Sequence, residues 1–302
     1  MIDFFRRIKY NVVVSASVDS VRSTERKVLF AEYERFFMYN KERIFENLRA
    51  LGAPRDKIVI MHSAYSLVGE FEGGPRAFLD ALIEYFTAEG GLFCIPTHTW
   101  GLLGETDLFL DMTEKYTNLG LLPRLALEDG RGVRSENPTH SIVVFGDKER
   151  AEELIECEKW VTTPTSPDGF YGALLSECGY VLLLGVTQTS NTFLHAVDEI
   201  LGISCRMSDK PLPARVKRSD GSIVEREFYM YNEEGGDISF LFDKFSLAFD
   251  YRGAVKRGKV GDSPAILCDA AAMTDTVELI YSRSGDIDPL GDNIPIPPRW
   301  YI

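Results

Sequence analysis

Four histidines are the residues of this chain that are best suited to proton transfer. His62, His98 and His195 each follow an apolar stretch that is typical of a buried strand, and His140 comes directly before one. Ligands of open α/β sheets bind beyond the carboxyl ends of the strands, and imidazole titrates near neutral pH. We therefore expect a site for acid–base chemistry at this edge of a sheet. His140 reaches it if its strand is antiparallel or if its loop folds back.

His195 and Asp198 form a pair with a recognisable chemistry. They lie three residues apart on an expected helix that begins near Thr192, so their side chains share a face. A carboxylate beside an imidazole orients the ring and raises its basicity, which is the arrangement of a general base. The same spacing suits zinc ligands, but the chain has no H-E-x-x-H pair and its other histidines are dispersed, so we expect no metal.

The turn from His62 to Gly74 has the features of an anion site. Hydroxyl side chains, two glycines and the start of an expected helix follow a buried strand. Free backbone N–H groups and the helix dipole favour a phosphate at such a position. The pattern matches neither the Walker A loop nor the Rossmann glycine motif, so a plain tight connection is the alternative.

Two charged segments bear on the substrate. An acidic segment runs from Gly104 to Glu114 and includes Asp107 and Asp111, and it would suit a polycation. A basic cluster within residues 206–218 would instead suit a nucleotide-linked sugar. A solvated surface explains the acidic segment equally well.

The composition narrows the class of protein. The chain has 302 residues, and its 33 basic and 46 acidic residues give a net charge of −13, which argues against a nucleic-acid partner. Its five cysteines include no C-x-x-C pair, which fits a reducing compartment, and we expect the cytoplasm. No apolar run approaches the roughly 18 residues that a membrane span needs, so we expect no membrane partner.

Hydrophobic periodicity predicts helices and strands in alternation. The expected helices cover residues 41–51, 76–88, 120–128, 148–157, 168–178, a stretch from about 192, 237–248 and 269–281. The expected strands cover residues 57–61, 92–95, 141–145 and 180–184, with a long irregular segment over 97–118 and a short extended piece before the last helix. Asp220-Gly221 between two extended stretches predicts a hairpin.

This order predicts a mixed α/β fold. We expect a largely parallel central sheet flanked by helices, because β–α–β units give parallel pairs with right-handed crossovers, and a C-terminal antiparallel addition. The single domain covers residues 39–285. Residues 1–38 form an N-terminal arm with one helix, and residues 286–302 form a proline-rich tail without regular structure.

The motifs occur in an order that resembles the aminoglycoside 3-N-acetyltransferase family, also called antibiotic N-acetyltransferases. The ordered strings are H-S-A-Y-S-L-V-G, P-T-H-T-W, R-S-E-N-P-T-H-S, L-L-L-G-V and N-T-F-L-H-A-V-D. The resemblance covers about residues 40–285. It implies that acetyl-CoA, as co-substrate, acylates a primary amine of an aminoglycoside-like amino sugar. We see no G-x-S-x-G elbow, so we expect direct attack without an acyl-enzyme.

The resemblance also implies roles for individual residues. His140 is the leading candidate for the base, and His195 and Asp198 are orienting or relaying groups. The expected donor-binding residues are His62, Ser63, Ala64, Tyr65, Ser66, Gly73, Gly74 and Ser141. The expected acceptor-binding residues are His98, Asp107, Asp111, Glu136 and Glu199.

Two departures from the family leave the acceptor open. The family usually has Glu where this chain has Asp198, and often His where it has Asn137. The same chemistry on a nucleotide-linked sugar, a cell-surface amino sugar or another small amine is the nearest alternative. A non-catalytic acyl-CoA-binding protein and a zinc-dependent hydrolase are rivals from other classes. A homodimer is compatible with the sequence.

Overall fold

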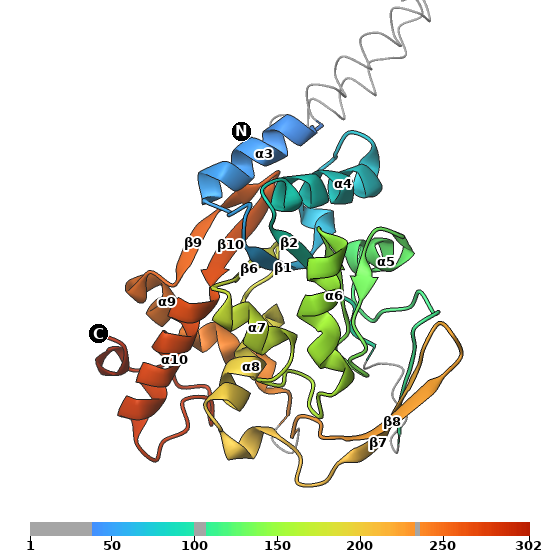
Figure 1. Cartoon of the computed structure of the whole chain (residues 1–302). Helices are drawn as coiled ribbons and strands as arrows, with labels where there is room; N and C mark the ends of the chain where they lie inside the picture. Colours follow the sequence, from blue (N-terminus) through green and yellow to red (C-terminus); the bar gives the residue numbers. More distant parts are fainter. Residues whose placement is uncertain (1–37, 100–106, 233–235) are drawn as a thin grey trace, which may run out of the picture. The chain divides into compact units, whose positions relative to one another are not determined.

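The computed structural model describes residues 38–99, 107–232 and 236–302. Contacts divide the chain into Met1–Tyr39 and Asn40–Ile302, and the second unit is described by itself below (Figure 1). The arm and helix expected over residues 1–38 therefore fall almost entirely outside the described residues, as does Gly104 of the acidic segment.

A seven-stranded mixed sheet forms the centre of this unit, in the order β4-β5-β2-β1-β6-β10-β9 (Figure 1). The strands are β1 (Ile58–Ser63), β2 (Leu92–Pro96), β4 (Val133–Arg134), β5 (Ile142–Phe145), β6 (Tyr180–Leu184), β9 (Val255–Val260) and β10 (Ser263–Asp269). Strand β1 pairs in parallel with β2 and β6, and the remaining pairings are antiparallel.

The mixed α/β class and the C-terminal antiparallel addition are confirmed, but parallel pairing within the seven-stranded sheet is confined to its three central strands. The reason is the length of the connections. Strands β9 and β10 are joined by a two-residue turn at Gly261, which only an antiparallel pair allows. The single short extended piece expected before the last helix is in fact this pair of strands.

The orientation of β5 settles how His140 reaches the carboxyl edge. Strand β5 is antiparallel to β2, with Pro96 opposite Ile142, so β5 begins where β2 ends. Of the two routes that the sequence leaves open for His140, the antiparallel strand is the correct one.

Helices cover both faces of the sheet. The helices are α3 (Lys41–Leu51), α4 (Gly74–Thr87), α5 (Leu121–Glu128), α6 (Lys148–Glu156), α7 (Phe170–Ser176), α8 (Phe193–Ile200), α9 (Ser246–Arg252) and α10 (Ala270–Ser284). Ile58, Ile60 and Cys94 belong to a core shared with α6 to α10. Phe93 points the other way and stacks on Phe86 of α4, with ring centroids 5.0 Å apart.

Helix α3 shows why the expected helices form where they do. Asn40 caps its first turn by accepting a hydrogen bond from the backbone N–H of Arg43. Gly52 ends it at φ 78°, a left-handed conformation that glycine adopts without strain. Ile44 and Leu48 are buried on one face, as the apolar spacing predicts.

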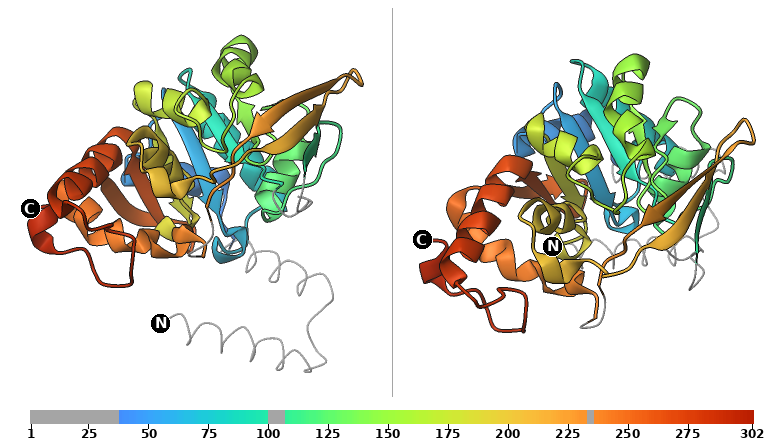
Figure 2. Two further views of the ribbon diagram at one scale, coloured as in Figure 1. Left: turned by 90° about the horizontal axis from the view of Figure 1, so that it is seen from below. Right: turned by 60° about the horizontal axis from the view of Figure 1, so that its bottom comes forward.

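The segment expected to be irregular contains a strand that the sequence analysis missed. Strand β3 (Leu108–Asp111) pairs in parallel with β7 (Leu212–Lys217), which pairs with β8 (Ile223–Phe228) to form a separate three-stranded sheet. The hairpin expected at Asp220-Gly221 is confirmed. Figure 2 shows it as a long two-stranded arm beside the main sheet.

The C-terminal part also differs in detail from the expectation. The helix expected over 237–248 is a 3-10 segment, Ile238–Phe245, followed by α9. The proline-rich tail over 286–302 has one 3-10 turn at Pro298–Trp300. Its apolar residues nevertheless pack into the main core: Leu290, Ile296, Trp300 and Tyr301.

Candidate functional site

The four histidines converge at the carboxyl edge of the central strands. Backbone bonds from Thr97 to Ser141 and from Thr99 to Thr139 continue the β2–β5 pairing, so His98 and His140 lie directly opposite each other. Their ring centroids are 4.2 Å apart. His62, near the end of β1, and His195, on α8, complete the histidine cluster.

Tyr231, which follows β8, joins the two sides of this cluster. Its ring stacks on His195 with centroids 4.2 Å apart and an interplanar angle of 14°, and it meets His140 edge-on at 5.5 Å. Phe242 covers His195 from another side, with ring centroids 4.8 Å apart. The small sheet therefore contributes an aromatic wall to the site.

Burial keeps these imidazoles uncharged near neutral pH. It lowers the pKa from the ordinary 6.5 to about 4 in His62 and His195 and to about 3 in His140. The pKa of His98 is also held well below its ordinary value, by burial and by the three other histidines. A neutral imidazole carries a free lone pair, so these rings are able to accept a proton.

Two ring nitrogens in the cluster lack partners. His62 Nε2 and His98 Nε2 are buried without a hydrogen bond. Buried polar atoms nearly always have a hydrogen-bond partner. Two such nitrogens without partners at one edge of the sheet therefore fit a ligand that supplies the missing hydrogen bonds.

The turn before β5 holds His140 through a network of buried side chains. Asn137 Oδ1 accepts hydrogen bonds from the backbone N–H groups of Thr139 (3.2 Å) and His140 (2.9 Å). Asn137 Nδ2 donates to Glu158 Oε2 at 2.8 Å. The hydroxyl of Thr139 lies 2.8 Å from His140 Nδ1. Burial raises the pKa of the Glu158 carboxyl, against the hydrogen bonds that it accepts.

The described side-chain partners of Asp198 lie away from His195. Asp198 Oδ2 accepts from Arg206 Nε at 3.1 Å, and Oδ1 accepts from the Tyr281 hydroxyl at 3.4 Å. Burial raises the pKa of Asp198 to about 6, although Arg206 favours its charged form. The carboxylate whose charge acts on His195 is Asp237. The shared helical face predicted from sequence therefore brings the acid into contact with Arg206 instead.

Glu199 anchors the aromatic wall. Its carboxylate accepts hydrogen bonds from the hydroxyls of Thr163 (2.5 Å) and Thr165. The Thr165 hydroxyl is in turn 2.8 Å from the Tyr231 hydroxyl. Glu199 thus reaches the histidine cluster through one threonine and one tyrosine.

The expected donor turn joins β1 to α4. The chain leaves β1 at Ser63, and the backbone N–H of Ala64 donates to the Leu184 carbonyl. Gly73 and Gly74 both have positive φ, at 79° and 74°. Helix α4 then begins with no side-chain cap and no acidic residue in its first turn, which favours an anion there.

Ser141, also expected to bind the donor, is fully buried and used within the fold. Its hydroxyl donates to the Thr97 carbonyl at 3.0 Å and accepts from Arg134 Nε at 3.2 Å. It helps to hold the loops that carry His98 and His140 together.

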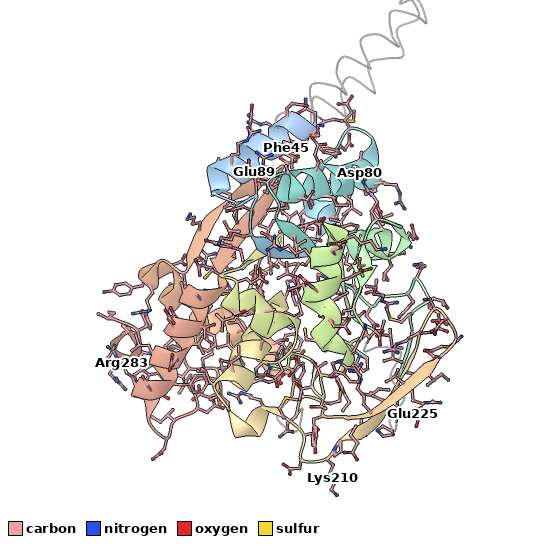
Figure 3. All side chains as sticks on the ribbon, in the orientation of Figure 1. Phe45, Asp80, Glu89, Lys210, Glu225 and Arg283 are labelled. Atoms are coloured by element: carbon pink, nitrogen blue, oxygen red, sulfur yellow. The ribbon has the colours of Figure 1, made fainter. Side chains whose placement is uncertain are left out.

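Two ion pairs join the acidic segment to the basic cluster: Asp107 with Arg215 (2.6 Å) and Asp111 with Lys217 (2.8 Å). Glu136, outside the acidic segment, pairs with Arg218 of the basic cluster (2.8 Å). Hydrogen bonds from Lys217 and Thr113 lower the pKa of Asp111 to about 2. Glu225 and Lys210 are exposed beside these pairs, at the outer side of the small sheet (Figure 3).

A cavity of about 360 Å³ lies along the segment before α5. Lys115, Thr117 and Arg124 are among its lining residues. The Thr117 hydroxyl donates to the His98 carbonyl at 2.8 Å, so one wall of the cavity leads to the histidine cluster.

Within the described ranges, no group of three or more His, Cys, Asp or Glu residues is arranged to hold a metal ion. In the same part of the chain, no helix is both long enough and apolar enough to cross a membrane.

Sequence reasoning missed three residues of this site: Glu158, Thr165 and Tyr231. The sequence places the Thr139 hydroxyl next to His140 in a turn marked by Asn-Pro, but it gives no hint of the buried carboxylate partner of Asn137. Glu158 follows a charged helix, a position that is typical of an exposed residue. Tyr231 lies beyond the hairpin, and no periodic pattern surrounds it. Their contacts join residues far apart in the chain, such as Thr165 and Tyr231.

Comparisons with known proteins converge on one family. The family model described as aminoglycoside 3-N-acetyltransferase matches residues 60–281. Aminoglycoside N(3)-acetyltransferase IX of Micromonospora chalcea is 26% identical over an alignment of 258 positions that covers 77% of this chain and 90% of that protein. The aminoglycoside N(3')-acetyltransferase-like protein YokD of Bacillus subtilis is 25% identical, over 80% of this chain and 91% of its own.

Solved structures share the fold. A structure of AAC-IIIb binary with CoASH has a TM-score of 0.70 at 22% identity, and it covers 83% of this chain and 100% of its own. The crystal structure of YokD from Bacillus subtilis has a TM-score of 0.68 at 24% identity, with 83% of this chain and 97% of its own covered.

Proposed function

Because the chain belongs to the aminoglycoside 3-N-acetyltransferase family, a family of acyltransferases, we propose that it transfers an acetyl group from acetyl-CoA to a primary amine of an aminoglycoside-like amino sugar. The observation that carries this proposal is the cluster of four uncharged imidazoles at the carboxyl edge of the central strands, together with the uncapped N-terminus of α4. The first feature suits deprotonation of an amine, and the second suits the phosphates of CoA.

The donor is proposed to bind at the turn between β1 and α4. We propose that His62, Ser63, Ala64, Tyr65, Ser66, Gly73 and Gly74 of this turn bind the donor. Ser141, also proposed for the donor, lies before β5 and bonds to Thr97 and Arg134. The unpaired Nε2 of His62 supports a ligand at this position. Acetyl-CoA, when bound, supplies a thioester that the amine attacks, so that a C–N bond forms as the C–S bond breaks.

His140 is proposed as the general base. An ammonium group must lose a proton before it attacks a carbonyl carbon, and the uncharged ring of His140 can accept that proton at Nε2. His195 lies against the same tyrosine and is proposed to assist. Asp198 is proposed as a positioning residue, because its pairing with Arg206 holds the end of the helix that carries His195.

The acceptor is proposed to lie against His98, Glu136 and Glu199. His98 offers an unpaired Nε2, and the Glu199 carboxylate suits an ammonium group. Glu136, Asp107 and Asp111 contribute only where an ammonium of the acceptor exchanges with Arg218, Arg215 or Lys217. A nucleotide-linked sugar is less well supported, because the cations that it would need are already paired with carboxylates.

The proposal also includes the cellular compartment of the enzyme. All five cysteines are free, which supports a reducing compartment, and we propose the cytoplasm. The homodimer stays a prediction.

Release of the free CoA thiol is the direct test. The protein is incubated with acetyl-CoA and a panel of amines that pairs 2-deoxystreptamine aminoglycosides with amino-sugar nucleotides. We expect thiol release with an aminoglycoside and the same rate in the presence of a metal chelator. Release only with sugar nucleotides would overturn the acceptor class. Binding of acetyl-CoA without release for any amine would overturn catalysis and favour a non-catalytic acyl-CoA-binding protein.

A further inference from the structure

The side chain of Arg206 joins three parts of the chain. Its Nε donates to Asp198 Oδ2 at 3.1 Å, and its Nη2 donates to the Tyr281 hydroxyl at 2.9 Å and to Asp288 Oδ1 at 2.7 Å. Asp198 lies on α8, Tyr281 lies on α10 and Asp288 lies in the proline-rich tail. The side chain of Arg206 is only 10% exposed. Because a guanidinium is planar with its donors in a fixed arrangement, it holds these partners in a defined geometry.

The backbone of the same residue holds the segment that carries Tyr231. The Arg206 carbonyl accepts a hydrogen bond from the backbone N–H of Asn232 at 2.8 Å. The next residue, Met207, forms an antiparallel bridge with Tyr231 itself. The side chain of Arg206 is therefore attached to the helix of His195, and its backbone is attached to the tyrosine that stacks on this histidine.

The stack of Tyr231 on His195 is the place where these two attachments meet. The ring centroids are 4.2 Å apart and the rings are within 14° of parallel. The attraction between two rings depends on their separation and offset, so a shift of α8 against the Tyr231 segment changes this contact. Tyr231 also meets the ring of His140 edge-on at 5.5 Å, so such a shift reaches the proposed base as well.

We propose that Arg206 is a positioning residue that sets the stack of Tyr231 on His195, and that Asp288 of the proline-rich tail holds Arg206 in this role. The inference rests on the proposed function in one respect, namely that His140 and His195 act on the acceptor amine. The family model matches residues 60–281, so Asp288 lies beyond the matched part of the chain. The tail thus contributes a side chain to the support of the site.

NMR of the histidine ring protons measures the stack directly in the full chain. The ring current of Tyr231 shifts the signals of an imidazole that lies face to face with it. The chain has only four histidines, so the signals that disappear in His195→Gln assign this ring. Tyr231→Leu removes the stacked ring and gives the reference shifts of His195 without it.

Arg206→Gln removes the guanidinium that joins the two carboxylates. We expect the His195 signals to move toward their positions in Tyr231→Leu. We also expect kcat to fall by roughly 10–10²-fold, because small displacements of reacting groups are costly, while the KM for acetyl-CoA stays unchanged.

Asp288→Asn is the second variant, because Arg206→Gln leaves Asp198 buried without its cation. It acts at the end of the network that is one-third exposed and leaves the contact between Arg206 and Asp198 in place. We expect the His195 signals to move in the same direction by a smaller amount, with a severalfold loss of kcat.

Asp292→Asn is the matched control. Like Asp288, which accepts a hydrogen bond from the backbone N–H of Leu290, Asp292 accepts one from the residue two positions later, Ile294. It also pairs with a cation, Lys244, at 3.3 Å, but this cation has no contact with α8 among the described side-chain bonds. We expect wild-type ring signals and wild-type kcat. Circular dichroism and Tm establish that the variants fold.

The two readouts separate this inference from the proposed function. Unchanged His195 signals in folded Arg206→Gln or in Asp288→Asn would overturn the inference. Moved signals with wild-type kcat would show that the stack does not serve the reaction, which also overturns the positioning role. If the wild type releases no CoA thiol with any amine, the proposed function fails, and the ring signals alone then decide whether Arg206 and Asp288 set the stack.

Discussion

The histidine cluster and the small sheet of β3, β7 and β8 handle polar side chains in opposite ways. In the cluster, His62, His98 and His140 are buried together, and burial lowers their pKa values and that of His195 until the rings are neutral. In the small sheet, Asp107 and Asp111 each form an ion pair with a cation of β7. The difference teaches that reactivity lies with the groups that lack partners, because paired charges are already satisfied.

Because of this difference, the charged segments, which stand out in the sequence, say less about function than the isolated histidines do. The acidic segment and the basic cluster are conspicuous in the sequence, but the fold places them against each other. Isolated histidines spread over 134 positions, from His62 to His195 (195 − 62 + 1), form the compact group. Charge content alone is therefore a poor guide to the acceptor of this enzyme.

Replacing His140 is the most direct test of whether the histidine cluster and the small sheet differ in their contribution to catalysis. We expect His140→Ala to lower kcat by about 10²–10⁴-fold, the usual contribution of a general base. Glu225→Gln, an exposed change on the small sheet, should leave kcat unchanged. Steady-state release of the CoA thiol measures both variants. Equal activities would remove the functional distinction between the regions.

Acid should destabilise the histidine cluster well before it affects the ion pairs. The folded pKa values of about 3 to 4 lie below the ordinary 6.5, so between these limits the unfolded chain binds more protons. The free energy of unfolding should therefore fall as pH drops from 6.5 to 4, by up to about 1.4 kcal/mol per pH unit for each histidine. Asp111, with a pKa of about 2, stays charged throughout this range.

Urea unfolding at a series of pH values measures this slope. His62→Gln removes one titrating ring and should flatten it. A free energy of unfolding that is constant from pH 6.5 to 4 would show that the rings are not held neutral by the fold.

A substitution at Gly73, in the donor turn, should have a larger effect than the same substitution at a glycine of similar conformation elsewhere in the chain. Gly73→Ala places a Cβ 2.8 Å from Ala77 Cβ at a φ of 79°, so we expect a loss of about 1–2 kcal/mol of stability and a severalfold higher KM for acetyl-CoA. Gly90→Ala is the matched control, because Gly90 has a φ of 84° beyond the other end of α4 and open space around it. It should lose stability without a change in KM. A raised KM in both variants would mean that strain, and not the turn, is responsible.

The smallest effect is expected at the ion pairs of the small sheet. Asp107→Asn and Asp111→Asn should change the KM for an aminoglycoside by less than about fivefold, because Arg215 and Lys217 already neutralise both carboxylates. Steady-state kinetics with varied acceptor measures this. A much larger rise in KM would show that ammonium groups of the acceptor displace these cations.

Local patterns were enough to predict most elements of the main sheet, and long-range pairing explains the rest. Helix α3 and strand β6 were predicted within a residue or two, because apolar spacing and flanking glycines are local signals. Strand β3 was missed, because its four residues become a strand only through pairing with β7, about 100 residues later.

The site divides in the same way. The expectation that histidines gather at the carboxyl edge is confirmed, since topology alone places them there. The side chains that contact each ring could not be predicted from the sequence. Asp198 shares a helical face with His195 but is drawn to Arg206, and Glu158 reaches His140 only through Asn137 and Thr139. Such choices depend on which groups are buried together, and a local pattern does not contain that information.

Strand β9 has a consequence for self-association. It is the last strand of the seven-stranded sheet, and an open sheet edge is a template on which a second chain can add a strand. Lys256, Arg257 and Lys259 place three exposed cations within its six residues, and Arg257 is paired with Asp250. A second copy that offered its own β9 would meet like charge at Lys256 and Lys259. Although the chain carries a net negative charge, β9 is locally positive, and this local charge disfavours polymerisation through the sheet edge.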